Sequence, residues 1–591
     1  MNQKDFLQES CALLDGMSKE QLRICLHHLA RKTIEKKRAE FLQLLHDCGS
    51  QLEPQPSGVK FHLKQQMSPE VLKQKLAAVR EVFAKIEDCE LCLSAQGQED
   101  YSDGYCLDEW IWHYEDKEGI GVAIEDAALL ACACVNDGRY AEALSVFELI
   151  MGTQVLVENE SSGDSFDFGI EELVQEKLVS INLRVLALNV LYAEYQLQPA
   201  DNRAPRLFSY FILSYFKDIH IEDILSVGRE DLGGLDLFFQ EWIDFLMLQK
   251  GEVAARLLRE GALYFRGTQG LVEAARLCYG LHPSLYMAAV LEYEKVNAYE
   301  SMIEIGKEAL ANLAGDCRLR GEIAVKVAQA SHGINDLQLM KASWYEAFYS
   351  NSTVANYLRL FFDADVAARY KDLARKRIDE VPISDTHVKD TSENARNTHT
   401  EAEYKSLCFF AGHFAKIKAW CLEHKSPVGW SSHFVRYGVD LLLLYLYAGS
   451  ILGKAGKKIA VQVAARSGFH ESQNLVFMLE NAVFATEAST QKGEEVFWGI
   501  FCRWKGNYTL TVDEASSHVL WLEALIDKRI EAIIGGKHRN KYGDVALLAA
   551  ALGEVKESLG AKSAKKEVVN KYLSKYPRHS AFREELRKFA D

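Results

Sequence analysis

The chain has 591 residues, of which 48% are hydrophobic and 26% are charged, and its formal net charge is −16. A chain of this length exceeds one compact core, and so apolar a composition excludes bulk disorder, so we expect two to four folded units. The acidic balance repels phosphate backbones and anionic lipid, which disfavours nucleic-acid or membrane binding by the whole surface.

Cysteine usage and the apolar runs indicate a cytoplasmic protein. The 13 cysteines are odd in number and scattered, so we interpret them as small buried side chains in a reducing compartment. The first residues lack the apolar stretch of a signal peptide. The longest apolar run, Val439 to Leu452, contains Asp440 and is shorter than the roughly 20 residues that span a bilayer. We therefore expect a core helix there and no membrane contact.

Helical patterns begin in an N-terminal region over 1–95, which we expect to form a helical cap. Ser68 and Pro69 are typical of the N-cap and first position of a helix. No segment longer than a few residues shows clear strand alternation. These patterns predict an all-α fold.

Two constellations in this region could carry chemistry. Arg23 and His28 have the spacing of a HEPN-type ribonuclease pair, but an amphipathic helix places such residues on its solvent side. Cys89 and Cys92 form a Cys-x-x-Cys pair, whereas a zinc site usually needs four ligands. We therefore expect no enzyme, no catalytic residue, no metal site and no cofactor, with a helical nuclease or metal enzyme kept as an alternative.

The next segment, from Gln98 to Asp116, is acidic and aromatic. Its carboxylates could steer a basic peptide and its rings could anchor it. The candidate partner-binding residues are Tyr101, Tyr105, Trp110, Trp112 and Tyr114. The alternative is a helix with a buried aromatic stripe, because Trp110, His113 and Tyr114 are spaced like one helical face.

The clearest organised pattern runs from Asp137 to Leu144 and follows a helix rich in alanine. Gly138 permits a left-handed turn, and small residues let two helices approach, so the pattern predicts an antiparallel helical hairpin. The sequence Gly138-Arg-Tyr-Ala-Glu-Ala resembles the second helix of a tetratricopeptide repeat. Weaker echoes begin at Gly251, Gly270 and Asn297, and their uneven spacing implies an irregular solenoid.

The domain organisation follows from these patterns and from one polar stretch. We expect helical repeats over 96–380, a flexible linker over 381–403, and a C-terminal helical domain with a basic tail over 404–591. Limited proteolysis is expected to cut the chain within 383–402.

The second half carries a longer resemblance, in Trp344-Tyr-Glu-Ala-Phe, Leu441-Leu-Leu-Leu-Tyr-Leu-Tyr-Ala-Gly and the closing Pro577-Arg-His-Ser-Ala-Phe. Their order is similar to the helical region after the zinc finger in bacterial SWIM-type zinc-finger proteins. The finger itself is absent, because Cys132-Ala-Cys134 lies in an apolar helix and the one Cys-x-His, which starts at Cys25, precedes it.

The C-terminal residues 528–591 carry more Lys and Arg than Asp and Glu. The candidate basic patch consists of Lys537, Arg539, Lys541, Lys571, Lys575, Arg578, Arg583 and Arg587. It could bind nucleic acid electrostatically, with few aromatic residues to stack on bases. The alternative is an ordinary solvated face of terminal helices.

These patterns together predict an irregular, tetratricopeptide-like α-solenoid of helical hairpins. The function we expect is a protein-protein interaction scaffold or adaptor that holds a peptide or folded partner, within a bacterial complex. A nucleic-acid-associated accessory protein is the alternative.

Overall fold

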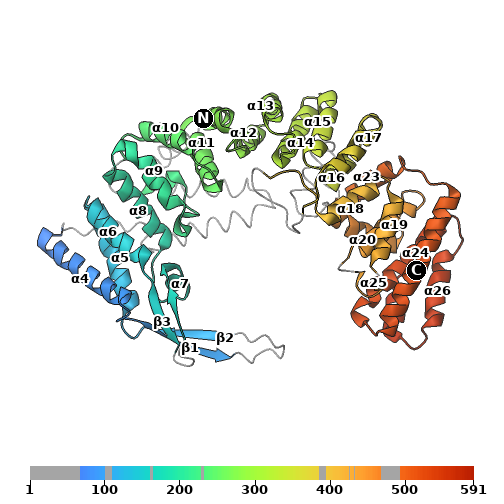
Figure 1. The fold of residues 1–591 in the computed structure, drawn as a ribbon, viewed down its shortest axis with the longest axis horizontal. Helices are drawn as coiled ribbons and strands as arrows, with labels where there is room; N and C mark the ends of the chain where they lie inside the picture. The colour runs from blue at the N-terminus through green and yellow to red at the C-terminus, as the bar shows by residue number, and fades with distance from the viewer. Residues whose placement is uncertain are drawn as a thin grey trace, which may run out of the picture. The chain divides into compact units, whose positions relative to one another are not determined.

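A computed structural model describes residues 67–99, 110–159, 164–227, 232–384, 395–424, 426–430, 433–467 and 493–590. The chain divides into two compact units, Met1–Leu281 and His282–Asp591. Helices dominate both units (Figure 1), so the predicted all-α class is confirmed apart from one small sheet. None of the described helices is long and apolar enough to cross a bilayer.

The first unit combines helices with four short strands. Its α-helices are α4 (Pro69–Glu87), α5 (Ile120–Asn136), α6 (Tyr140–Gly152), α7 (Ile170–Gln175), α8 (Leu183–Leu197), α9 (Ala200–Phe211), α10 (Leu235–Leu246) and α11 (Glu252–Cys278). Two 3₁₀ helices, η2 (Ser214–Phe216) and η3 (Ile221–Ser226), follow α9. The side chain of Ser68 caps α4 by accepting the N–H of Val71, and Pro69 is the first residue, as predicted.

The strands form one sheet in the order β2-β1-β3-β4, with bounds β1 (Leu93–Glu99), β2 (Trp110–Glu115), β3 (Val155–Asn159) and β4 (Ser165–Phe168). This small sheet was not predicted, because no segment showed clear strand alternation. The parallel pairing of β1 with β3 joins Leu93 to Val157. Because this pairing links segments that are distant in the sequence and the strands are short, local alternation could not reveal it.

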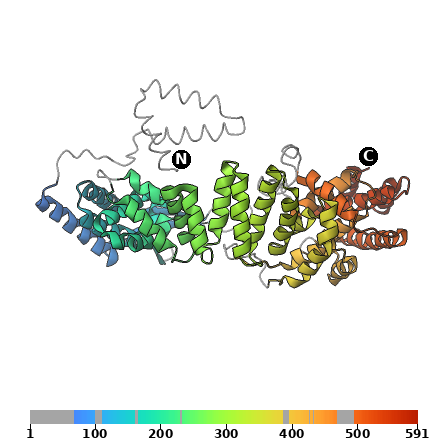
Figure 2. The same cartoon turned by 90° about the horizontal axis from the view of Figure 1, so that it is seen from above.

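The second unit is wholly helical in its named elements. They are α12 (Ser284–Lys295), α13 (Tyr299–Asn312), α14 (Arg318–Gly333), α15 (Leu337–Ser350), α16 (Val354–Arg359), α17 (Ala364–Glu380), α18 (Glu401–Phe410), α19 (Phe414–Glu423), α20 (Phe434–Leu446), α21 (Lys454–Arg466), α23 (Gly493–Lys505), α24 (Val512–Gly535), η6 (Arg539–Lys541), α25 (Tyr542–Ser558), α26 (Ala564–Lys575) and α27 (Ser580–Arg587). Helices α12 to α15, yellow-green in Figure 2, pack in sequence as two successive hairpins.

One turn recurs in four hairpins: α5/α6, α12/α13, α14/α15 and α18/α19 each have a three-residue connection. The middle residue has a positive φ, of 74° at Gly138, 54° at Asn297, 61° at Asn335 and 82° at Gly412. The next residue donates its N–H to the carbonyl five positions earlier, at 2.9 Å for Arg139, 3.0 Å for Ala298, 2.8 Å for Asp336 and 2.9 Å for His413. This Schellman geometry ends the first helix and starts the second.

The hairpins predicted at Gly138 and at Asn297 are thus confirmed, and Gly251 precedes α11, which packs on α10. The echo at Gly270 instead falls inside α11, just after a kink at Gly267 with φ 63°. Its glycine permits close helical packing rather than a hairpin turn, because an added Cβ would lie 2.9 Å from the carbonyl oxygen of Ala262.

The shared turn leads to a testable contrast. Gly138→Ala is expected to lower the free energy of unfolding by about 1 kcal/mol, because an L side chain disfavours positive φ. No steric loss is added, because a Cβ there would meet nothing within 4 Å. Gly412→Ala is expected to lose more, because its Cβ would lie 2.6 Å from Cε1 of Tyr508. Urea unfolding of both variants measures the difference. Equal losses at the two positions would contradict this explanation.

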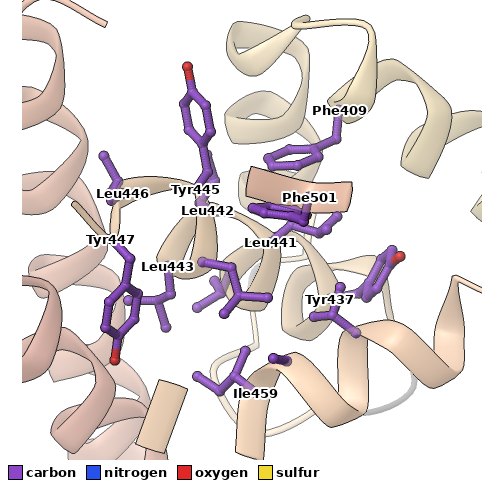
Figure 3. Packing of buried hydrophobic residues seen from close by; sticks show 14 of the residues in the cluster. Phe409, Tyr437, Leu441, Leu442, Leu443, Tyr445, Leu446, Tyr447, Ile459 and Phe501 are labelled. Carbon is purple, nitrogen blue, oxygen red and sulfur yellow. The ribbon is translucent and has the colours of Figure 1, made fainter. Parts of the chain in front are cut away.

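The core of the second unit surrounds α20, whose residues from Val435 to Leu446 are all buried. Figure 3 shows its leucines packed with Phe409 and Phe501 from neighbouring helices. The run predicted from Val439 to Leu452 is therefore a core helix as far as Leu446, whereas the residues after it leave the helix and Ile451 is exposed.

The predicted linker lies inside the second unit, and its middle, 385–394, is outside the described residues. On either side the backbone is paired, because the N–H of Ser384 donates to the carbonyl of His399 at 2.7 Å. Asn397 is buried, and its Oδ1 accepts the N–H of Ser352 at 3.1 Å.

Candidate functional site

The predicted aromatic anchors divide between a strand and the undescribed part of the chain. Trp110, Trp112 and Tyr114 lie on β2, so the alternative of a helical aromatic stripe is wrong for this stretch. Tyr101 and Tyr105 lie outside the described residues. Trp110, Trp112 and Tyr114 are two positions apart, and residues at this spacing lie on the same face of a strand. An interpretation as a helix does not group them in this way.

The described rings from β2 contact rings from β4, the strand at the opposite edge of the sheet. Trp112 meets Phe166 edge to face with ring centroids 6.3 Å apart, and Tyr114 meets Phe168 in the same way at 4.9 Å. The register partner of Tyr114 is the small residue Ala95. These contacts show both rings holding the sheet together, and neither ring is fully exposed.

Several thiols of the described residues have raised pKa values. Burial, together with the charges of Glu158 and Glu118, raises the pKa of Cys92, and burial raises the pKa values of Cys132 and Cys134 to about 11. A protonated thiol is a poor nucleophile and metal ligand. Within the described residues, no three His, Cys, Asp or Glu side chains gather as a metal site would require.

Part of the predicted basic patch forms ion pairs between helices. Lys571 on α26 lies 2.9 Å from an Asp527 oxygen on α24 and 3.4 Å from Glu523, and Lys575 pairs with Glu531. Lys541 lies 4.0 Å from Asp544.

The other predicted cations are differently placed. Arg583 donates to the carbonyl of Pro577 at 2.8 Å. Lys537 has a φ of 56° and lies in the turn after α24. Arg539 is on η6, Arg578 precedes α27 and Arg587 ends it. The structure therefore places Lys571 and Lys575 in the α24–α26 contact rather than on an uncommitted basic face.

The second unit contains a cavity of about 600 Å³ that the sequence did not suggest. It lies between the end of α20, the last turn of α23 and the connection from α23 into α24. We name this cavity the Lys505 pocket. The residues that line it are Tyr445, Leu446, Tyr447, Ala448, Gly449, Ser450, Cys502, Lys505, Gly506, Tyr508, Thr509, Leu510, Ala515 and Leu559.

Tyrosines form much of the wall and are fixed by their hydroxyl groups. Tyr445 donates to the carbonyl of Tyr508, and the hydroxyls of Tyr508 and Tyr357 are 3.0 Å apart. Tyr447 donates to the Glu554 carboxylate. Figure 3 shows Tyr445 and Tyr447 leaving the end of α20 in opposite directions. Since each ring is anchored at its far end, the wall is pre-formed.

Three hydrogen bonds fix the connection that follows α20. The indole of Trp498 donates to the carbonyl of Ser450 at 2.7 Å, and Ser558 accepts the N–H of Ala448 at 3.0 Å. The ammonium of Lys505 donates to the carbonyl of Tyr447. These contacts come from α23 and α25, so the pocket depends on packing within the second unit.

Lys505 is the one charged side chain among the described residues that line the pocket. It is half-buried, and burial lowers its pKa. Desolvation has this effect because it disfavours the charged form of an amine. The residue therefore places a poorly solvated positive charge among aromatic rings.

Leu559 of the pocket lining, and two apolar residues near other lining residues in the sequence, are exposed to solvent. Leu559 is 47% exposed, and Ile451 and Val512 are 88% and 83% exposed. Single exposed apolar residues are ordinary, whereas several beside a concave site are typical of an interaction surface.

No family model matches the chain, and no curated protein matches its sequence. The tetratricopeptide and SWIM-type resemblances therefore remain predictions. The only sequence signal for the pocket was a lone lysine after Trp504 in an aromatic helix, which an exposed helix end would equally explain.

Proposed function

We propose that the chain is a protein-interaction adaptor that holds a peptide segment of a partner in the Lys505 pocket. The observation that carries this proposal is a pre-formed, tyrosine-walled cavity of about 600 Å³ whose lining includes the exposed Leu559. Binding energy at protein interfaces concentrates in aromatic anchors that occupy such pockets. The exposed apolar residues beyond the lining favour a peptide over a small molecule, because they lie outside the volume that a small molecule would fill.

The helical framework supports this role. Successive hairpins with the same turn make a rigid support, and partners bind more tightly where little ordering is needed. A solenoid arrangement of all hairpins would add further surface, and this arrangement is part of the proposal.

Panning a random dodecapeptide library displayed on phage against the immobilised full chain tests the proposal. Recovered phage are then compared on the wild type, on Ala515→Trp and on Ala561→Trp. Ala515 lines the pocket, so a tryptophan there fills it, whereas Ala561 is exposed after α25 and serves as the matched control. We expect peptides with a large apolar residue that bind wild type and control alike.

On Ala515→Trp the same peptides are expected to bind at least about tenfold more weakly, as loss of one buried anchor would give. Absence of enriched peptides, or equal binding to Ala515→Trp, would refute the pocket as a binding site. Circular dichroism of Ala515→Trp is the control that tests whether the variant keeps its fold.

A further inference from the structure

The Lys505 ammonium is a half-buried cation that no carboxylate of the described residues neutralises by direct contact. It donates to the carbonyl of Tyr447, and no carboxylate of the described residues lies within 4.0 Å of its nitrogen. A charge without a counter-ion in a partly dry site is costly and is usually retained for a reason other than stability. A bound anion would remove this cost.

Other charged groups near the pocket do not fill that role. Glu514, the third residue of α24, is engaged at the helix cap, where it accepts both the N–H and the hydroxyl of Thr511 at 2.9 Å. Lys371 lies 5.8 Å from the ring centroid of Tyr508 and adds positive charge. Carboxylates also act on the wall tyrosines, Glu554 and Glu557 on Tyr447 and Asp372 on Tyr508. Among the described residues, Lys505 is nevertheless the one charged residue that lines the pocket itself, and it favours an anionic ligand at that point.

We propose that the Lys505 pocket binds the side-chain carboxylate of an Asp or Glu residue in the partner peptide, with a neighbouring large apolar side chain against the tyrosines. This inference rests on the proposed function and adds the chemistry of the ligand. A carboxylate at the ammonium would form a charge-assisted hydrogen bond, which is shorter and stronger than a neutral one.

The exposed apolar residues around the pocket favour an internal acidic residue over a chain terminus. They belong to separate segments, with Ile451 after α20, Val512 at the start of α24 and Leu559 after α25. A peptide that continues past Lys505 in both directions can contact more apolar surface around the pocket than one that ends there. The cavity is also larger than one carboxylate requires, so it has room for the adjoining side chain.

Synthetic peptides from the phage selection, acetylated and amidated at their ends, test this inference on the full chain by fluorescence anisotropy. Each is compared with a version in which Asp or Glu is replaced by Asn or Gln. We expect the replacement to weaken binding at least about tenfold, as loss of one side of a desolvated charge pair does. Lys505→Met should weaken the acidic peptide by a similar factor and leave the amide version nearly unchanged.

Lys505→Arg should keep most of the preference, because it keeps the charge. Thermal melting tests whether Lys505→Met still folds. We expect little loss of stability, because the substitution removes a poorly solvated charge. Pocket-dependent peptides whose acid and amide versions bind equally would overturn the carboxylate assignment but leave the proposed function standing. A second set of the same peptides is made with a free terminal carboxylate, and a preference for acid that appears only in that set would overturn the assignment too. Failure to select any pocket-dependent peptide instead contradicts the proposed function.

Discussion

Replacing Glu554 with alanine is expected to lower the free energy of unfolding of the second unit by about 3 to 5 kcal/mol. The carboxylate is 6% exposed and accepts the N–H groups of Ala455 and Gly456 at 3.0 and 2.9 Å, together with the hydroxyl of Tyr447. It thus caps the first turn of α21 from α25, and its loss would leave three buried donors without an acceptor.

Glu554 and its partner Tyr447 explain why two positions near the start of α21 are glycine. A Cβ at Gly453 would lie 2.3 Å from the carboxyl carbon of Glu554, and one at Gly456 would lie 2.6 Å from the hydroxyl of Tyr447. These glycines begin α21 and let α25 and the pocket wall come close.

Hydrogen–deuterium exchange of residues 454–466 in the full chain measures this effect locally. Glu584→Gln is the matched control, since Glu584 is an exposed glutamate on α27. Exchange in Glu554→Ala should be much faster than in the control, because the capped amides open more often. Equal protection in the two variants would mean that the cap contributes little.

Asp440→Leu is expected to lower the free energy of unfolding by a similar amount, about 3 to 5 kcal/mol, because it removes one partner of a buried ion pair. Asp440 is 2% exposed on α20, and its Oδ2 accepts from Nε of Arg436 at 2.9 Å. Arg436 also donates to Gln462 at 3.1 Å. Without the carboxylate, a buried guanidinium would lack its counter-charge.

The double variant Arg436→Leu/Asp440→Leu separates charge from packing. Removal of both charges is expected to recover most of the lost stability, since paired apolar replacements of buried ion pairs are often neutral. Asp365→Ala is the control, because its side chain is 96% exposed. Urea unfolding gives the comparison, and a double variant as unstable as Asp440→Leu would contradict the assignment.

Local signals in the sequence were sufficient for the helices and for some of their turns. Gly138 identified its hairpin because a positive φ favours glycine. Asn335 and Gly412 make the same turn without a nearby repeat pattern, so their hairpins were missed. The sheet was missed because Leu93 pairs with Val157, a partner that no local window contains.

The Lys505 pocket could not be predicted for the same physical reason. Its wall combines α20 residues near Tyr445, α23 residues near Lys505 and Leu559 after α25, which only tertiary packing brings together. Trp112 and Tyr114, two of the aromatic residues predicted to anchor a partner, instead pack against Phe166 and Phe168 of the same sheet. Aromatic richness alone does not distinguish an anchor from a packed ring.

Photocrosslinking from the pocket lining tests the central claim most directly. A benzophenone amino acid replaces Leu559 in the full chain, and a second chain carries it at Leu422, an equally apolar residue on α19 that is 57% exposed. With a phage-selected peptide present, we predict a crosslink from position 559 that excess unlabelled peptide abolishes, and none from position 422. Equal crosslinking from both positions, or none from 559 while the peptide is bound, would contradict the account.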